Sequence, residues 1–106
     1  MEFYNLTAIV RNTRLEAVEQ RLQEANVRGI TVTKAKGYGE YKNFFASDWM
    51  ISHARLEVFT SRAEEVADLI VEAAHTAKRG DGIVAIAPIR KVIRIRDRCE
   101  LGAGES

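Results

Sequence analysis

Two short stretches of the sequence carry residues suited to binding an anion. The first is the turn Gly80-Asp81-Gly82, which follows Lys78 and Arg79. Glycines remove side chains, so backbone N–H groups can approach a ligand closely, and successive N–H groups form an anion-binding nest. The alternative is a helix C-cap glycine followed by an ordinary turn, and the turn alone favours this simpler interpretation.

The second stretch is the alternating run VIRIR at 92–96. In a strand, Ile93 and Ile95 would face one way and Arg94 and Arg96 the other, with the two guanidinium groups roughly 7 Å apart. That spacing suits successive phosphates of a nucleotide. The competing interpretation is a solvated edge-strand face, where charges block unwanted strand pairing. Proximity of the glycine turn to these arginines would favour the phosphate site.

No arrangement of residues in the sequence predicts catalysis. The candidate ligands His53, His75 and Cys99 lack metal-ligand spacing, and no nucleophile lies in a recognised motif. The clustered carboxylates are typical of the solvated face of a helix; they are Glu64, Glu65, Asp68 and Glu72. We therefore expect a protein that is not an enzyme, with no metal site and no catalytic cofactor.

Length and charge restrict the class of protein further. The chain has 106 residues, which indicates one domain, and its net charge of +1 predicts no general attraction to nucleic acid or membrane. A single cysteine, Cys99, excludes an internal disulfide and favours a reducing compartment. The N-terminus lacks the basic region of a signal peptide, so a cytoplasmic location is expected.

Hydrophobic periodicity predicts the elements that must position these residues. Strands are predicted at the alternating runs 30–36, 53–60 and 92–96, at 3–10, which is rich in β-branched and aromatic residues, and at the apolar run 83–89. Two capping boxes, Thr13 with Glu16 and Ser61 with Glu64, each predict the start of a helix, and Gly29 is expected to end the first one.

The order of elements predicts the fold class. A βαβ unit, a loop and a second βαβ unit make an α+β, ferredoxin-like βαββαβ fold: an antiparallel sheet with two helices on one face. The other sheet face would be bare in a single chain, so a homo-oligomer is expected.

An RNA-binding module is the alternative from the residues alone. Lys36, Gly37, Tyr38 and Gly39 are similar to the start of the RNA-recognition-motif signature, but the next two residues depart from it and the segment follows the wrong strand. Tyr38 and Tyr41 would then stack on bases. No nucleic-acid partner is expected on the leading interpretation. A third possibility is an oligomeric adaptor with a vestigial pocket.

Three segments together resemble the PII signal-transduction proteins. They are GITVTKAKGYG at 29–39, AAHTAKRGDGIV at 73–84 and VIRIR at 92–96, in the order and spacing of that family. The resemblance implies a trimeric ferredoxin-like domain over 1–98, with a T-loop at about 38–52 and a flexible tail at 99–106. It also implies a homotrimer that binds adenine nucleotides in clefts between subunits and controls a protein partner, such as a transporter, an enzyme or a carboxysome-linked protein, through the T-loop.

The same resemblance implies which residues form the nucleotide site. The phosphates would lie on the glycine turn and on two arginines of a facing subunit or sheet: Gly80, Asp81, Gly82, Arg94 and Arg96. The adenosine would lie against Ile9, Gly29, Ile30 and Thr31, and against backbone groups of Glu57, Val58 and Phe59. The base of the T-loop would be Gly37, Tyr38 and Gly39.

The chain departs from the family pattern where positive charge is expected. Glu40 and Tyr41 replace Arg-Gln, His53 replaces a lysine used for 2-oxoglutarate, and Ile83 replaces a phosphate-binding lysine. We therefore expect ADP or AMP to be preferred over Mg-ATP, and little response to 2-oxoglutarate. Bicarbonate, sensed by an inorganic-carbon-associated branch, is one expected effector. A classical nitrogen-regulatory PII is the alternative within the family.

Overall fold

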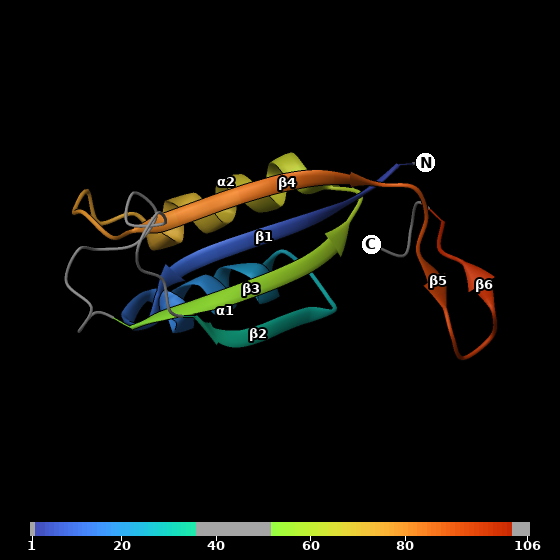
Figure 1. The fold of residues 1–106 in the computed structure, drawn as a ribbon, viewed down its shortest axis with the longest axis horizontal. Helices are drawn as coiled ribbons and strands as arrows, with labels where there is room; N and C mark the ends of the chain where they lie inside the picture. Colours follow the sequence, from blue (N-terminus) through green and yellow to red (C-terminus); the bar gives the residue numbers. More distant parts are fainter. Residues whose placement is uncertain (1, 36–51, 103–106) are drawn as a thin grey trace.

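The computed structural model describes residues 2–35 and 52–102, which form a four-stranded sheet, two helices and a small hairpin (Figure 1). In chain order the elements are β1 (Phe3–Arg11), the 3-10 turn η1 (Asn12–Arg14), α1 (Leu15–Glu24), β2 (Ile30–Ala35), β3 (His53–Thr60), α2 (Ala63–Ala74), β4 (Gly82–Ile89), β5 (Ile93–Arg94) and β6 (Cys99–Glu100). The expected T-loop, including Gly37, Tyr38 and Gly39, lies outside the described residues except for Ser52.

The sheet has the strand order β2-β3-β1-β4 and every neighbouring pair is antiparallel. β1 is central: its residues pair with β3 from Tyr4↔Thr60 to Arg11↔His53, and with β4 from Phe3↔Ile89 to Val10↔Gly82. Both helices cover the same face (Figure 1). This confirms the predicted α+β ferredoxin-like βαββαβ fold.

The core lies between the helices and one face of the sheet. Alternation along β1 buries Leu6, Ala8 and Val10, and alternation along β3 buries Leu56 and Val58. These side chains pack against apolar residues at helical spacing, which are Val18, Leu22, Val66 and Ile70. Burial of each larger aliphatic side chain contributes about 1.5–3 kcal/mol, so this face determines the register of the two inner strands, β1 and β3.

None of the described helices or strands packs on the opposite face of the sheet in the single chain. Phe59 is 46% exposed, and Ile9 and Ile83, a cross-strand pair farther along the same face, are partly exposed. The expected bare face is therefore present, and it supplies the apolar surface that association of copies would bury.

The helix ends differ from the predicted ones. Neither capping box forms: η1 precedes α1, and neither helix has a side-chain cap hydrogen bond. Before α2, Thr60 accepts from the Arg62 backbone N–H at 3.0 Å instead. α1 ends at Glu24, and Asn26, with φ of +59°, provides the left-handed residue expected at Gly29.

The C-terminal segment also differs. Residues 92–96 were expected to form one strand, but only Ile93 and Arg94 are extended, and Arg96 lies in the turn that leads to β6. Asp97 causes this: its carboxylate accepts from the Arg94 guanidinium at 2.7 Å and from the Cys99 backbone N–H at 3.1 Å, which closes a hairpin. The expected tail at 99–106 therefore begins with an ordered strand.

Membrane-spanning helices and clusters of metal ligands are both absent from the described residues. No helix in 2–35 or 52–102 is long and apolar enough to cross a membrane. Within the same residues, no three side chains of His, Cys, Asp or Glu gather as metal ligands would.

Candidate functional site

The glycine turn is organised around the carboxylate of Asp81. Asp81 Oδ2 accepts from the backbone N–H of Thr76 at 2.8 Å and of Ala77 at 3.0 Å. Asp81 Oδ1 accepts from the Thr76 hydroxyl and from Arg11 Nε, the latter at 3.1 Å. The carboxylate is thus surrounded by donors of its own chain. In this chain Asp81 shapes the turn, while the sequence alone had suggested a role beside the phosphates.

These contacts determine the protonation of Asp81. Partial burial by itself acts to raise the pKa of Asp81, but hydrogen bonds from the side chain and backbone of Thr76, from Arg11 and from Ala77 outweigh it. The pKa falls from its ordinary value of 3.8 to about 2. The turn is therefore built for an ionised carboxylate.

Asp81 is expected to make the stability of the fold sensitive to acid. Because its pKa is lower in the folded than in the unfolded chain, the ionised group stabilises the fold above about pH 4, by about 1–2 kcal/mol. This stabilisation is lost as the pH falls through about 2. Urea unfolding of Asp81→Asn should show that loss already at pH 7 and a flatter pH dependence between pH 4 and pH 2. Asp68→Asn, which removes an exposed carboxylate from α2, is the matched control; equal pH profiles for the two variants would contradict the assignment.

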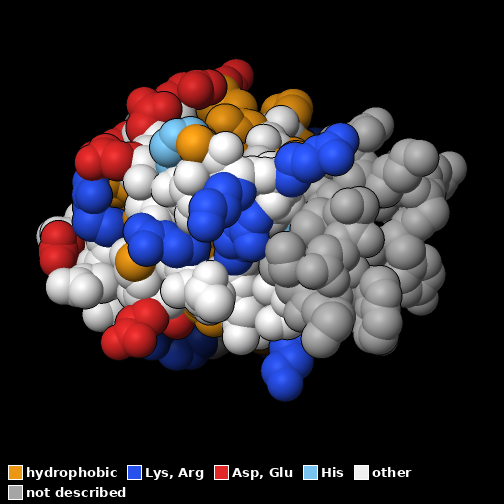
Figure 2. Space-filling model, turned by 90° about the vertical axis from the view of Figure 1, so that its left-hand side faces the viewer, with side chains coloured by type: hydrophobic (Ala, Val, Ile, Leu, Met, Phe, Trp, Pro, Cys, Tyr) orange, Lys and Arg blue, Asp and Glu red, His pale blue; other side chains and the backbone are white. Residues whose placement is uncertain are grey.

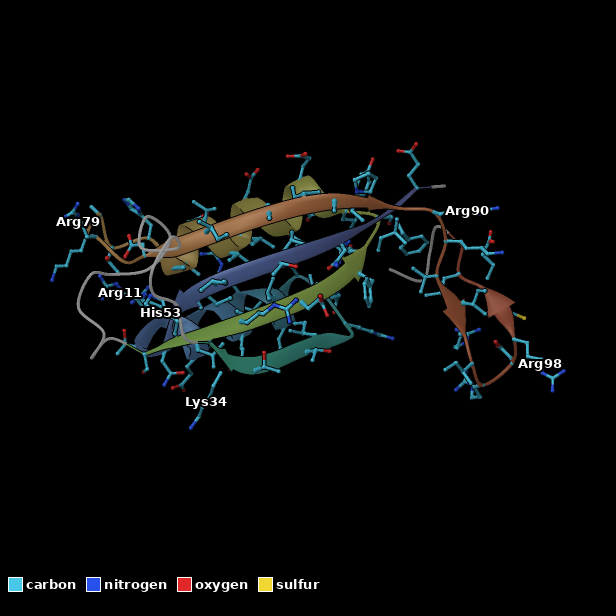
Figure 3. The ribbon with its side chains drawn as sticks, in the orientation of Figure 1. Arg11, Lys34, His53, Arg79, Arg90 and Arg98 are labelled. Carbon is cyan, nitrogen blue, oxygen red and sulfur yellow. The ribbon has the colours of Figure 1, made fainter. Side chains whose placement is uncertain are left out.

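Two residues that were not predicted to support the turn hold it from the sheet. Arg11 Nη2 donates to the carbonyl of Arg79, and His53 Nε2 lies 2.7 Å from the carbonyl of Gly80. Figure 3 shows Arg11, His53 and Arg79 at the same end of the molecule. Neither residue belongs to a recognisable motif, and only the β1–β3 register, which pairs Arg11 with His53, brings them together.

Gly82 is required by the sheet. Its φ is +103°, and a Cβ there would lie 1.7 Å from the carbonyl oxygen of Ile9 on the neighbouring strand. Gly80 also has a positive φ, of +90°. Gly82 therefore permits the tight approach of the turn to β1, and Gly80 adopts a backbone conformation that L side chains rarely take.

A pocket opens beside the turn. It is lined by Ile9, Asp81, Gly82 and Ile83 from the strands and turn, and by Val71 and His75 from the end of α2, together with Val10, Ile70, Ala74 and Val84. Three of the predicted nucleotide-binding residues, Ile9, Asp81 and Gly82, therefore border one pocket. Viewed on this end, Lys and Arg side chains gather on the surface, as an anionic ligand would require (Figure 2).

A second group of predicted residues lies elsewhere on the sheet. Ile30 pairs with Val58 and Thr31 pairs with Glu57, so the segments 29–31 and 57–59 are side by side. Glu57 also accepts from Arg55 at 3.1 Å and lies 3.5 Å from Asn5. On β1, residues 5–7 face this group, whereas the glycine turn ends at Gly82, opposite Val10.

Arg94 and Arg96 lie at the far end of the molecule from the turn. β4 has 8 residues and therefore spans roughly 25 Å; the turn precedes it and the β5–β6 hairpin follows it. Figure 3 shows the labelled Arg79 at one end and Arg98, in the hairpin, at the other. Within one chain these arginines therefore do not approach the turn, so a shared phosphate site would need them from a facing subunit.

Comparison with known proteins identifies the class of protein to which this fold and turn belong. Residues 3–98 match the sequence model of the family "Nitrogen regulatory protein P-II". The P-II protein of Azospirillum brasilense is 33% identical over 100 residues, covering 86% of this chain and 89% of that protein. GlnK of Escherichia coli strain K12 is 31% identical with the same coverage. The chain belongs to the nitrogen regulatory P-II family.

Plant relatives give the same result. A P-II homologue of rice is 35% identical over 118 residues; the match includes 97% of this chain but 56% of the rice protein, so the chain spans about half the length of that relative. The crystal structure of Arabidopsis thaliana PII bound to citrate superimposes with a TM-score of 0.78 and 30% identity, covering 93% of this chain and 88% of that one.

Family membership decides between several expectations from the sequence. P-II proteins are non-catalytic regulators, so the chain is not an enzyme, and nucleotide binding is typical of the family. The RNA-recognition alternative loses its basis because the family match covers nearly the whole domain. The relatives are nitrogen regulatory proteins, so the expected inorganic-carbon branch and its bicarbonate effector gain no support, and the classical alternative is favoured.

Proposed function

We propose that the chain is a nitrogen-regulatory signalling protein that binds an adenine nucleotide between the subunits of a homotrimer. The observation that carries this proposal is the separation of the predicted site into parts. The turn with its pocket lies before β4, and Arg94 and Arg96 lie after it. A second copy that brings its arginines to the turn of the first would complete the site, and the bare sheet face provides surface for that association.

Nucleotide preference follows from the charges beside the turn. Ile83 follows Gly82 and lines the pocket, at the position where the family pattern has a lysine. Each lost charge-assisted contact costs about 1.5–3 kcal/mol, and a ligand with more phosphates loses more of them. We therefore propose that ADP or AMP binds more tightly than Mg-ATP.

Response to a dicarboxylate should be weak for a separate reason. His53 occupies the position of the lysine that the family pattern uses for 2-oxoglutarate, but it is 3% exposed and its Nε2 is bonded to the carbonyl of Gly80. The side chain is therefore engaged by its own chain, while the family pattern has a lysine side chain at this position.

Control of a target protein through the T-loop completes the proposed function.

Isothermal titration of the purified protein with AMP, ADP and ATP tests the proposal. Each nucleotide is titrated with and without Mg²⁺, 2-oxoglutarate and bicarbonate, and the oligomeric state is measured by light scattering. We expect a trimer, about ten times tighter binding of ADP than of Mg-ATP, and little change with 2-oxoglutarate. A monomer, or no binding of any nucleotide, would refute the proposed function. Tight Mg-ATP binding that 2-oxoglutarate strengthens would refute the argument from lost charge. Tighter nucleotide binding in the presence of bicarbonate would instead support a member of the inorganic-carbon branch.

A further inference from the structure

Arg11 and His53 act on the same turn from adjacent positions of the sheet. Arg11 ends β1 and His53 begins β3, and the two are cross-strand partners. Arg11 donates to the carbonyl of Arg79 and to the carboxylate of Asp81, while His53 contacts the carbonyl of Gly80. Three successive residues of the turn are thus held by one pair of side chains.

The direction of these contacts determines where the N–H groups of the turn point. A carbonyl only accepts, so Nε2 of His53 carries the proton that it donates. In a trans peptide the C=O and the following N–H point in opposite directions, and no cis bond occurs among the described residues. When the carbonyls of residues 79 and 80 face Arg11 and His53, the N–H groups of Gly80 and Asp81 face away from the sheet.

Both side chains are well placed to hold this orientation. His53 is 3% exposed and the side chain of Arg11 is 14% exposed, so their contacts with Gly80 and Asp81 are partly shielded from water, whereas the contact of Arg11 with the carbonyl of Arg79 is exposed. Arg11 is also paired with Asp81, whose carboxylate fixes the start of the turn at Thr76 and Ala77.

We propose that Arg11 and His53 are positioning residues that orient the backbone N–H groups of Gly80 and Asp81 toward the phosphates of the bound nucleotide. The inference rests on the proposed function for its ligand, but the orientation of the N–H groups does not. The backbone beside His53 is held as well. His53 is the first residue of β3, and its neighbour Ser52 accepts from the Asn12 backbone N–H at 3.0 Å.

The ligand test compares nucleotides that differ only in phosphate. His53→Leu removes the donor and keeps an apolar volume, His53→Gln keeps an N–H donor of similar reach, and Arg11→Lys keeps the charge but loses the fork that bridges two acceptors. Arg21→Lys, whose partner Glu72 lies on α2, is the matched control. We expect ADP binding to weaken about tenfold in His53→Leu and Arg11→Lys, with adenosine binding unchanged, and to stay near wild type in His53→Gln and Arg21→Lys.

Two outcomes of that titration would overturn the proposal. Unchanged ADP affinity would show that the N–H groups do not depend on these residues. Equal weakening of adenosine and ADP would show a general distortion of the cleft. Should His53→Leu fail to fold, Arg11→Lys against Arg21→Lys decides the same question.

Residual dipolar couplings test the orientation without any nucleotide. In ¹⁵N-labelled protein, the couplings of the Gly80 and Asp81 N–H bonds should change in His53→Leu and Arg11→Lys and stay constant in Arg21→Lys. Constant couplings in all variants would overturn the positioning role. If wild type bound no nucleotide while these couplings changed as expected, the proposed function would fail and the positioning of the turn would stand.

Discussion

Replacing Gly82 by alanine is expected to destabilise the fold by about 3–5 kcal/mol. The added Cβ would lie 1.7 Å from the carbonyl oxygen of Ile9, and the φ of +103° disfavours any L side chain. β1 and β4 must separate at this point to admit it, although their pairing continues from Val10↔Gly82 to Phe3↔Ile89. Equilibrium unfolding in urea, followed by circular dichroism, measures the change.

Gly29→Ala is the matched control for this prediction. Gly29 also has a positive φ, of +71°, but a Cβ there would meet no atom within 4 Å. Its substitution should cost only about 1–2 kcal/mol, the backbone strain alone. Equal losses at the two positions would show that the contact with Ile9 is relieved by a small shift. If Gly82→Ala destabilises the fold as expected, loss of nucleotide binding in that variant would not show that Gly82 contacts the nucleotide.

Arg94→Ala is expected to weaken ADP binding by about 10- to 100-fold while the trimer remains intact. Arg94 is the predicted phosphate ligand in the hairpin, where Asp97 holds its guanidinium at 2.7 Å and so limits its freedom. Titration calorimetry and size-exclusion chromatography measure the two quantities. Arg98→Ala removes the same charge from the same hairpin and is the control. Similar losses of ADP affinity in both variants would show that the positive charge of the hairpin matters, and not a specific contact of Arg94.

Mixing subunits tests whether the two parts of the site come from different chains. Neither Arg94→Ala nor Asp81→Ala trimers should bind ADP well. After unfolding and refolding an equal mixture, about a quarter of the interfaces combine an intact turn with an intact arginine, so about a quarter of the binding capacity should return. A site contained in one chain would recover nothing on mixing.

The sheet could be predicted from the sequence because burial on one face determines it. The segment 53–60 alternates between apolar and other residues, and β3 has these bounds in the structure. The segments 3–10 and 83–89 each differ from the observed strand by one residue. In β1 and β3 the pattern follows from the core, because every second side chain of these strands is buried in it.

The helix ends and the C-terminal hairpin could not be predicted because single short-range contacts decide them. At 61–64 the capping box competes with the Thr60 hydroxyl, which takes the Arg62 N–H instead. At 92–96 the alternation favours a strand, but Asp97 accepts from Arg94 and from the Cys99 N–H and turns the chain back. Neither competing contact leaves a pattern that extends over several residues.

The candidate site was predictable in its glycine turn and not in the residues that support it. Gly80, Asp81 and Gly82 stand together in the sequence, whereas Arg11 and His53 are far from the turn and from each other along the chain. Only the strand register makes them neighbours. His53 stands where the family pattern has a lysine, which suggested that a contact with the ligand is lost. Nothing in the sequence indicated that His53 instead contacts the carbonyl of Gly80.

The central position of β1 has a consequence for synthesis of the protein. β1 is translated first, yet its two neighbours are β3 and β4, and Phe3 finds its β4 partner only at Ile89. At about 5–20 residues per second, the ribosome needs several seconds to complete that partner. During this interval the apolar face of β1 has no finished sheet to join, and chaperones have their longest access to the nascent chain.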